Sequence, residues 1–193
     1  MKTATVTVLI SLLVVTHGLA EPREFKIDPD HFSIGFLVDH VGYAKQLGKF
    51  LEGEGHFVYD EQANELISGA VTIAADSIFT NHRRRDRHLR SNDFLHARRH
   101  DKIRFEATEY RPDDAGGGTL EGKLSLLGQT HPVQLQVTIN KTGEYPFGHE
   151  AYTIGVSART TIRRSQWGMD YGIADGLVGD EVELMFELEA LRQ

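Results

Sequence analysis

The chain has 193 residues, of which 40 % are hydrophobic and 25 % charged, and its formal net charge at pH 7 is −7. This length predicts one domain, and this composition is typical of a soluble globular protein rather than of a disordered chain or a multi-pass membrane protein. The acidic balance argues against a general nucleic-acid-binding protein. The absence of cysteine excludes disulfides, Cys-ligated zinc, iron–sulfur clusters and thiol nucleophiles.

The first 20 residues have the pattern of an export signal. Lys2 precedes an apolar stretch at 4–15, which is too short to span a bilayer, and the small residues Gly18 and Ala20 follow it. We therefore expect 1–20 to be a cleaved signal peptide and 21–193 to be a single domain located in the periplasm. The alternatives are an uncleaved membrane anchor or a buried first strand.

From residue 25 onward the hydrophobic pattern has a period of two. In the segment 181–189, Val182, Leu184, Phe186 and Leu188 share one face, and glutamates dominate the other. Alternation of this kind indicates a strand with one apolar face and one polar face. The remaining sequence predicts strands at 32–38, 48–59, 67–74, 103–110, 120–126, 133–140 and 151–162, with 25–27 as a candidate ninth.

One-sided strands in a single domain must close around a shared interior, either as a barrel or as a two-sheet sandwich. Mid-strand glycines at Gly53, Gly55 and Gly155 favour the barrel, because glycine often marks the bends that a curled sheet needs. The predicted fold is all-β, an eight-stranded antiparallel barrel. The interior of such a barrel is filled by side chains or holds one small ligand.

The segment between Thr80 and Asp101 breaks the alternation and predicts a short helix or two that cover the barrel around 81–100, with Asn81 and Ser91 as candidate N-caps. Seven arginines and two aspartates lie between 82 and 100. Guanidinium groups of this density match phosphate oxygens, which would make the segment an anion site. The alternative is a solvated cover whose arginines pair with surface glutamates.

Histidines are also concentrated in this segment. His96 and His100 are four residues apart, which on a helix places them on one face, and His82, Asp86 and His88 lie nearby in the sequence. A zinc site needs three or four well-placed ligands, and the surrounding arginines would repel a dication. No metal site is therefore expected.

Several motifs resemble those of the YceI-like family, which comprises exported, lipocalin-like bacterial proteins that bind polyisoprenoids. The central block reads Thr-Asn-His at 80–82 and Arg-Asp-x-His-Leu-Arg-Ser-x-Asp-Phe-Leu at 85–95. Further blocks are His-x-Gly-Tyr at 40–43, Gly-x-Leu-x-Leu-x-Gly-x-Thr-x-Pro-Val at 122–133, and Gly-Asp-Glu-Val-Glu-Leu at 179–184. Phe79 and the pair His100-Asp101 depart from the family pattern, at the ligand end and at the turn into the next strand.

The resemblance implies a lipocalin-like barrel with a long apolar cavity for an isoprenoid tail, of the polyprenyl quinone or polyprenyl phosphate type. The expected function is that of an exported, non-enzymatic carrier or storage protein, with the bound lipid as ligand and no cofactor. The expected partner is the lipid, without nucleic acid, and with at most transient contact with a membrane. The chain is expected to be a monomer or a homodimer.

Candidate binding residues are of two kinds. The apolar cavity is expected to be lined by aromatic and aliphatic side chains in the matched blocks: Phe36, Val38, Phe50, Phe57, Phe79, Phe94, Phe105, Leu124, Leu126, Trp167, Leu184 and Phe186. Candidates for a polar headgroup are His40, Arg85, His88 and Arg90. For each apolar position ordinary core packing is the alternative, and Arg85–Asp86 and Arg90–Asp93 are alternatively internal ties of the cover. Trp167 caps a barrel end or lies at an aqueous mouth.

Two other functions stay open at the level of the sequence. The first is an interaction or stress-response protein whose barrel is filled by its own side chains. The second is an enzyme that uses the His, Arg and Asp side chains of the cover for acid–base chemistry. The sequence has no Gly-x-Ser-x-Gly elbow and no phosphate-binding glycine loop, so no catalytic residue is assigned.

Overall fold

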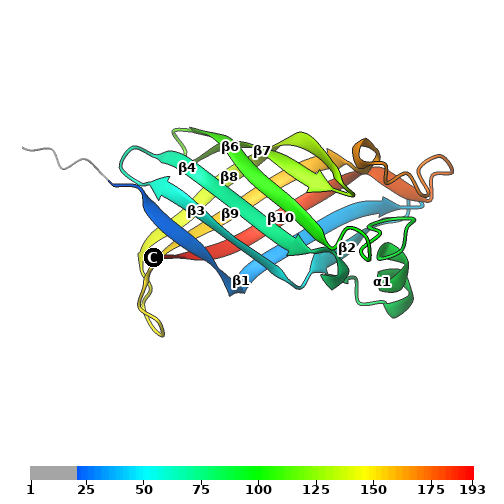
Figure 1. Cartoon of the computed structure of the whole chain (residues 1–193), viewed down its shortest axis with the longest axis horizontal. Helices are drawn as coiled ribbons and strands as arrows, with labels where there is room; N and C mark the ends of the chain where they lie inside the picture. The colour runs from blue at the N-terminus through cyan, green and yellow to red at the C-terminus, as the bar shows by residue number, and fades with distance from the viewer. Residues whose placement is uncertain (1–20) are drawn as a thin grey trace, which may run out of the picture.

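The computed structural model describes residues 21–193, and the predicted signal peptide at 1–20 lies outside the described residues. Strands dominate this part of the chain (Figure 1). Their bounds are β1 Arg23–His40, β2 Ala44–Phe50, β3 Gly53–Asp60, β4 Glu65–Ala74, β5 Ile78–Phe79, β6 Lys102–Pro112, β7 Gly117–Leu126, β8 Gln129–Glu144, β9 Tyr152–Arg163 and β10 Val178–Arg192. Among residues 21–193, no helix is long and apolar enough to cross a membrane.

Eight of these strands close into an antiparallel barrel, as predicted. The hydrogen-bonded order runs β1-β3-β4-β6-β7-β8-β9-β10, and β10 pairs back with β1 from Phe25↔Arg192 to His40↔Val178. β2 and β5 extend the sheet at one end beside β1. Closure satisfies the backbone groups that the edges of an open sheet would leave unpaired.

The first strands differ from the prediction in two places. The predicted strands 25–27 and 32–38 belong to one long strand, β1, whose register with β10 shifts between Ile27 and Phe32. The predicted strand 48–59 is two strands, β2 and β3, because the chain leaves the ladder at 51–52. β1 therefore pairs with β3 through its first residues and with β2 through its last.

Two apolar clusters close the two ends of the barrel. At the end that carries the helix, Phe94 and Leu95 from the cover pack with Trp167 and Met169. At the opposite end the buried cluster contains Phe25, Ile27, Tyr59, Ile154 and Ala190. Figure 1 shows these ends far apart along the long axis of the barrel, with α1 (Arg83–Leu89) at one of them.

The cover contains one α-helix rather than two. His82, not Asn81, is its N-cap, with the ring Nδ1 accepting a hydrogen bond from the backbone N–H of Arg85 at 3.3 Å. Asn81 has a φ of 59°, so its backbone lies in the left-handed region and the extended N-cap conformation falls to the next residue. Ser91 begins no second helix; the chain from there to His100 forms turns.

Candidate functional site

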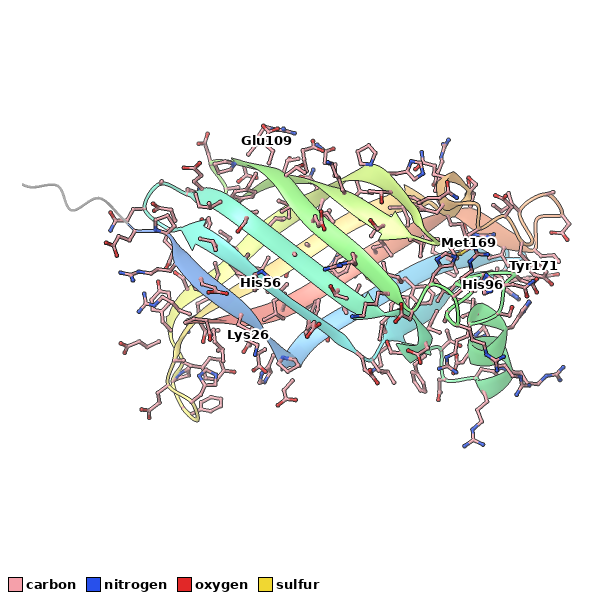
Figure 2. The ribbon with its side chains drawn as sticks, in the orientation of Figure 1. Lys26, His56, His96, Glu109, Met169 and Tyr171 are labelled. Atoms are coloured by element: carbon pink, nitrogen blue, oxygen red, sulfur yellow. The ribbon has the colours of Figure 1, made fainter. Side chains whose placement is uncertain are left out.

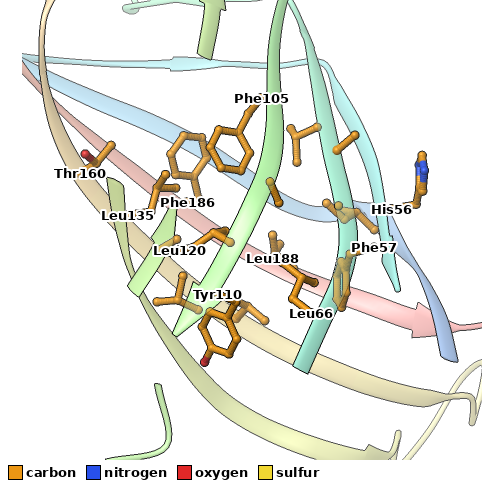
Figure 3. Close-up of a pocket in the computed structure, with 18 of the residues that line it drawn as sticks. His56, Phe57, Leu66, Phe105, Tyr110, Leu120, Leu135, Thr160, Phe186 and Leu188 are labelled. Carbon is orange, nitrogen blue, oxygen red and sulfur yellow. The ribbon is translucent and has the colours of Figure 1, made fainter. Parts of the chain in front are cut away.

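An apolar cavity of about 160 Å³ lies inside the barrel between the two end clusters. Every strand of the closed circuit contributes to it, and nearly all the contributing side chains are hydrocarbon or aromatic (Figure 3). Its lining includes Ile27, Phe32, Phe57, Leu66, Val71, Phe105, Tyr110, Leu120, Leu124, Leu135, Val137, Ile139, Val156, Leu184, Phe186 and Leu188. His56 also contributes, but Figure 3 shows its ring pointing away from the other side chains.

Small residues create the space. The ladders place Gly69 opposite Phe57, and Gly122 opposite both Ala107 and Val133, so that these residues lie at one level of the inner wall. A Cβ at Gly122 would lie 2.2 Å from two ring atoms of Phe105, so glycine is required there for the ring to lie against the wall. Large side chains at Gly69, Ala107 and Gly122 would fill the centre of the barrel.

Five of the twelve predicted apolar residues line the cavity: Phe57, Phe105, Leu124, Leu184 and Phe186. In Figure 3 the rings of Phe105 and Phe186 lie side by side at one end of the cavity. Both are only partly buried, although both face the barrel interior, because the cavity exposes them.

The other seven predicted apolar residues lie outside this cavity. Phe36, Phe94, Leu126 and Trp167 are buried in the cluster that closes the helical end, and Val38 and Phe50 pack against it. Phe79 is 37 % exposed on β5. Whether any of the twelve contacts a ligand stays a prediction.

Sequence reasoning missed most of the cavity wall between β6 and β9. Leu120, Leu135, Val137, Ile139 and Val156 all face the cavity, but none was chosen. The alternation of 120–126 and 133–140 already placed the first four of these residues on the apolar face of their strands. An aliphatic residue on such a face carries no signal that separates a cavity wall from ordinary core.

The helical end is sealed by buried polar as well as apolar groups. Trp167 is 1 % exposed, and its Nε1–H donates to the carbonyl of Leu124 at 3.1 Å. Arg164, 2 % exposed, donates to the carbonyls of Met169, Tyr171, Val178 and Gly179 at 2.6–2.9 Å. Burial lowers the pKa of Arg164, and the nearby Asp180 and Asp170 oppose this effect.

Two of the predicted headgroup residues tie the cover to the segment 76–80 that precedes it. Arg85 donates to the side-chain and carbonyl oxygens of Thr80 at 2.7 and 2.8 Å. Arg90 donates to the carbonyls of Asp76 and Ile78 at 2.6 and 2.8 Å. The internal ties therefore exist, but they join these arginines to the segment 76–80 rather than to Asp86 and Asp93. A contact with a ligand headgroup stays a prediction for both.

The other predicted polar residues lie at the same end. The ring of His88 bonds to Asp93 at 2.9 Å and packs edge-on against Phe94 and Tyr171. His40 is exposed at the end of β1. His96 and His100 flank the turn at 97–99, with their ring centres 5.8 Å apart. Within residues 21–193, no group of three or more His, Asp or Glu side chains is placed to hold a metal ion.

Tyrosines gather at the opposite end of the barrel. The hydroxyls of Tyr59 and Tyr110 donate to the side chain of Asn64 and to the carbonyl of Gly117 at 2.5 and 2.8 Å. Tyr152 donates to Glu61 at 2.7 Å. Burial raises the pKa of Tyr59 to about 12, with smaller contributions from Tyr110 and the carboxylates beside it. These hydroxyls remain neutral at physiological pH and are occupied by protein acceptors.

A closed eight-stranded antiparallel barrel around an apolar cavity defines a protein of the lipocalin-like class. The profile of the YceI-like domain matches residues 25–190. A UPF0312 protein of Pseudomonas aeruginosa is 33 % identical over 180 residues, covering 92 % of each chain. Another UPF0312 protein, from Pectobacterium carotovorum, is 34 % identical over 183 residues, covering 94 % of this chain and 93 % of the relative. The chain belongs to the YceI-like family, as its motifs indicated.

Solved structures show the same fold. BcnA of Burkholderia cenocepacia superposes with a TM-score of 0.75 at 19 % identity, covering 84 % of this chain and 98 % of BcnA. The YCEI protein of Campylobacter jejuni superposes with a TM-score of 0.72 at 23 % identity, covering 80 % and 89 %. A polyisoprenoid binding domain from Saccharophagus degradans superposes with a TM-score of 0.62 at 15 % identity, covering 88 % and 98 %.

Proposed function

We propose that this protein binds an isoprenoid lipid in its barrel and acts as an exported, non-enzymatic carrier or store of that lipid. The observation that carries the proposal is the apolar cavity, which lies between two sealed ends and is bounded by all eight strands of the barrel. Family membership and the likeness to a polyisoprenoid binding domain support the same ligand class. The signal-like pattern at 1–20 supports export to the periplasm.

The size of the cavity limits how much of a tail it holds without rearrangement. An engineered apolar cavity of about 150 Å³ in another protein admits benzene, so 160 Å³ suits a ring or a short branched hydrocarbon unit. A longer tail must displace the partly buried rings of Phe105 and Phe186 or leave the barrel through its wall. If such a rearrangement encloses ~20 carbons, at about 0.3 kcal/mol per heavy atom they yield about −6 kcal/mol, a Kd of tens of micromolar.

Non-directional contacts suffice for this function. Burial of apolar surface supplies the binding free energy, and no charged side chain faces the cavity. The proposed selectivity is therefore for a flexible, branched hydrocarbon of suitable width. Nothing in the cavity is arranged to activate a nucleophile or transfer a proton, which favours binding over catalysis as the role of this site.

A lipid extraction tests the proposal. Full-length protein is expressed with its N-terminal segment, purified without detergent and extracted with organic solvent, and the extract is analysed by mass spectrometry. The proposal predicts an isoprenoid lipid in a fixed ratio to protein. An extract free of apolar lipid, together with no binding of added isoprenoids, would favour the ligand-free interaction protein instead.

A further inference from the structure

The barrel wall has a gap between β8 and β9. Their ladder runs from Glu144↔Tyr152 to Gln136↔Arg159 and stops there, although β8 begins at Gln129 and β9 continues to Arg163. On their other sides both strands stay paired, β8 with β7 to the turn and β9 with β10 to Arg163↔Glu181. The gap therefore separates two strands that are each held in place.

An open groove of about 770 Å³ lies over this gap on the outside of the barrel. Unlike the cavity, it is lined mainly by amide, hydroxyl and charged side chains: Gln134, Gln136, Arg159, Thr160, Thr161, Arg163, Gln166 and Glu183. Val133, Thr160 and Leu184 line both the groove and the cavity. These three residues therefore form the wall between the two spaces.

Thr160 marks the junction. It pairs with Leu184, which faces the interior, so its side chain faces the interior as well. Figure 3 shows its hydroxyl oxygen at the edge of the lining, on the side away from the ring of His56. Within residues 21–193, no protein group accepts from or donates to this hydroxyl. A ligand that passes from the cavity into the groove meets a free hydrogen-bonding group at this point.

The charged groups of the groove already have partners. Arg159 donates to Glu187 and to the carbonyls of Ala158 and Phe186. The carboxylate of Glu183 pairs with Lys45, and Arg163 lies 3.6 Å from Glu181. The uncharged groups left for a ligand are the hydroxyls of Thr160 and Thr161, the amide of Gln166 and the side-chain carbonyls of Gln134 and Gln136, whose Nε2 groups bond to Glu121 and Thr119. They suit an uncharged polar group better than a phosphate.

A second gap, between β4 and β6, has apolar edges. That ladder covers only Ala70↔Glu106 to Ala74↔Lys102, which leaves 65–69 and 107–112 unpaired with each other. Leu66, Gly69, Ala107 and Tyr110 face the cavity along it. Enclosing a polar group there without a hydrogen-bond partner costs about 1–3 kcal/mol in proteins. The β8–β9 groove instead offers hydrogen-bond partners and contact with solvent.

We infer that the bound lipid lies with its tail in the cavity and its polar end in the β8–β9 groove, beside Thr160, and that this polar end is uncharged, as in a prenyl alcohol or quinone. This inference rests on the proposed function and adds to it the position and chemistry of the polar end. It assigns Thr160 as the residue at which the tail site ends and the polar site begins.

Photo-cross-linking locates the polar end. The probe is a farnesol analogue with a diazirine at its alcohol end, bound to the full chain, irradiated and mapped by peptide mass spectrometry. The inference predicts adducts within 132–136 and 159–166. Adducts concentrated within 65–70 and 106–112 would place the polar end at the β4–β6 gap and would overturn it.

A pair of matched substitutions tests the chemistry. Thr160→Val removes the junction hydroxyl, and Thr138→Val makes the same change at an exposed position in the paired part of β8. We expect Thr160→Val to lower the affinity for farnesol by about threefold to tenfold, because one hydrogen bond is lost. The affinity for the hydrocarbon farnesene should not change. Thr138→Val should change neither the affinity for farnesol nor that for farnesene.

The remaining outcomes separate the two proposals. Binding of both ligands with no effect of Thr160→Val would overturn the position of the polar end but leave the carrier function intact. Tighter binding of farnesyl phosphate than of farnesol would overturn the inference that the polar end is uncharged, and would also leave the carrier function intact. Failure of the wild-type protein to bind either farnesol or farnesene would instead remove the proposed function. Thr161→Trp, at an exposed position, provides a second variant that fills the groove from outside the barrel.

Discussion

Trp167 and Leu124 join the seal at the helical end of the barrel to the wall of the cavity. The indole Nε1–H of Trp167 donates to the backbone carbonyl of Leu124 at 3.1 Å, and the side chain of Leu124 lines the cavity. Figure 2 shows Met169, from the same loop as Trp167, at this end beside His96 and Tyr171. The seal therefore bounds the space available to a ligand and stabilises the barrel at the same time.

Removal of the indole should destabilise the barrel. Because Trp167 is 1 % exposed, we expect Trp167→Ala to lower the free energy of unfolding by about 3–5 kcal/mol. Chemical denaturation followed by circular dichroism measures the change. Tyr171→Ala, at a 44 % exposed residue nearby in the sequence, is the control and should cost far less. A loss below about 1 kcal/mol for Trp167→Ala would contradict the account of the seal.

Arg164 should be more important to stability than its charge suggests. Arg164→Met leaves four carbonyls without their donor, and we expect a loss of about 3 kcal/mol or more in the free energy of unfolding. Arg164→Lys should fall between wild type and Arg164→Met, because one ammonium cannot reach all four oxygens. Arg163→Gln is the exposed control. Equal stability of Arg164→Met and Arg163→Gln would disprove this role.

The pair His31–Asp28 should make stability depend on pH. The His31 Nδ1–H donates to the Asp28 carboxylate at 2.7 Å, and this bond raises the pKa of His31 and lowers the pKa of Asp28. The stability that His31 contributes to the folded protein is therefore fully present below its ordinary pKa of 6.5, and it is lost as the pH rises through the raised pKa of the folded state. The stability that Asp28 contributes is present above its ordinary pKa of 3.8, and it is lost as the pH falls through the lowered pKa of the folded state.

His31→Gln should accordingly lower Tm at pH 5.5 and leave it unchanged at pH 9. Asp28→Asn, measured over the same pH range, should lower Tm most at pH 5.5, where both members of the pair are charged. Thermal melts at matched ionic strength provide the comparison. A decrease in Tm that is equal at both pH values would mean that packing, rather than the charge pair, carries the effect.

Measurements of stability and of ligand binding can show whether the arginines of the cover are internal ties or contact a ligand headgroup. Arg85→Gln and Arg90→Gln remove bonds to the segment 76–80, and we expect each to cost about 1–2 kcal/mol of stability without changing the affinity for farnesyl phosphate relative to farnesol. Arg84→Gln, exposed on the same helix, should change neither property. A selective loss of phosphate binding without a loss of stability would confirm the headgroup prediction instead.

The fold could be predicted from the sequence because the alternation of apolar and polar residues identifies the buried face of each strand. Alternation at 181–189 and 133–140 specifies which side chains point inward, and one-sided strands must close. The break between β2 and β3 was missed, although the inward-facing set changes from Gly48 and Phe50 to Gly53, Gly55 and Phe57 across 51–52. Residues an odd number of positions apart cannot share one face of an uninterrupted strand, so this change of phase was the signal that two strands meet there.

The site could be predicted only in part from the sequence. Phe36 and Phe57 both face inward, but Phe36 belongs to the end cluster and Phe57 to the cavity. The difference depends on the height of each residue along the barrel, which the tilt and stagger of all eight strands determine together. The β8–β9 gap is equally invisible in the sequence, since it depends on where a ladder stops.

Binding of an isoprenoid inside the barrel is tested most directly by filling the cavity. Ala107→Leu introduces a larger side chain at the level of Gly69 and Gly122, and Thr108→Leu makes a comparable change on the outer face of the same strand. Titration of farnesol against both variants and the wild type, with folding verified by circular dichroism, is the measurement. The account predicts at least a tenfold loss of affinity in Ala107→Leu and none in Thr108→Leu. Equal affinity in all three proteins would contradict it, because the ligand would then bind outside the cavity.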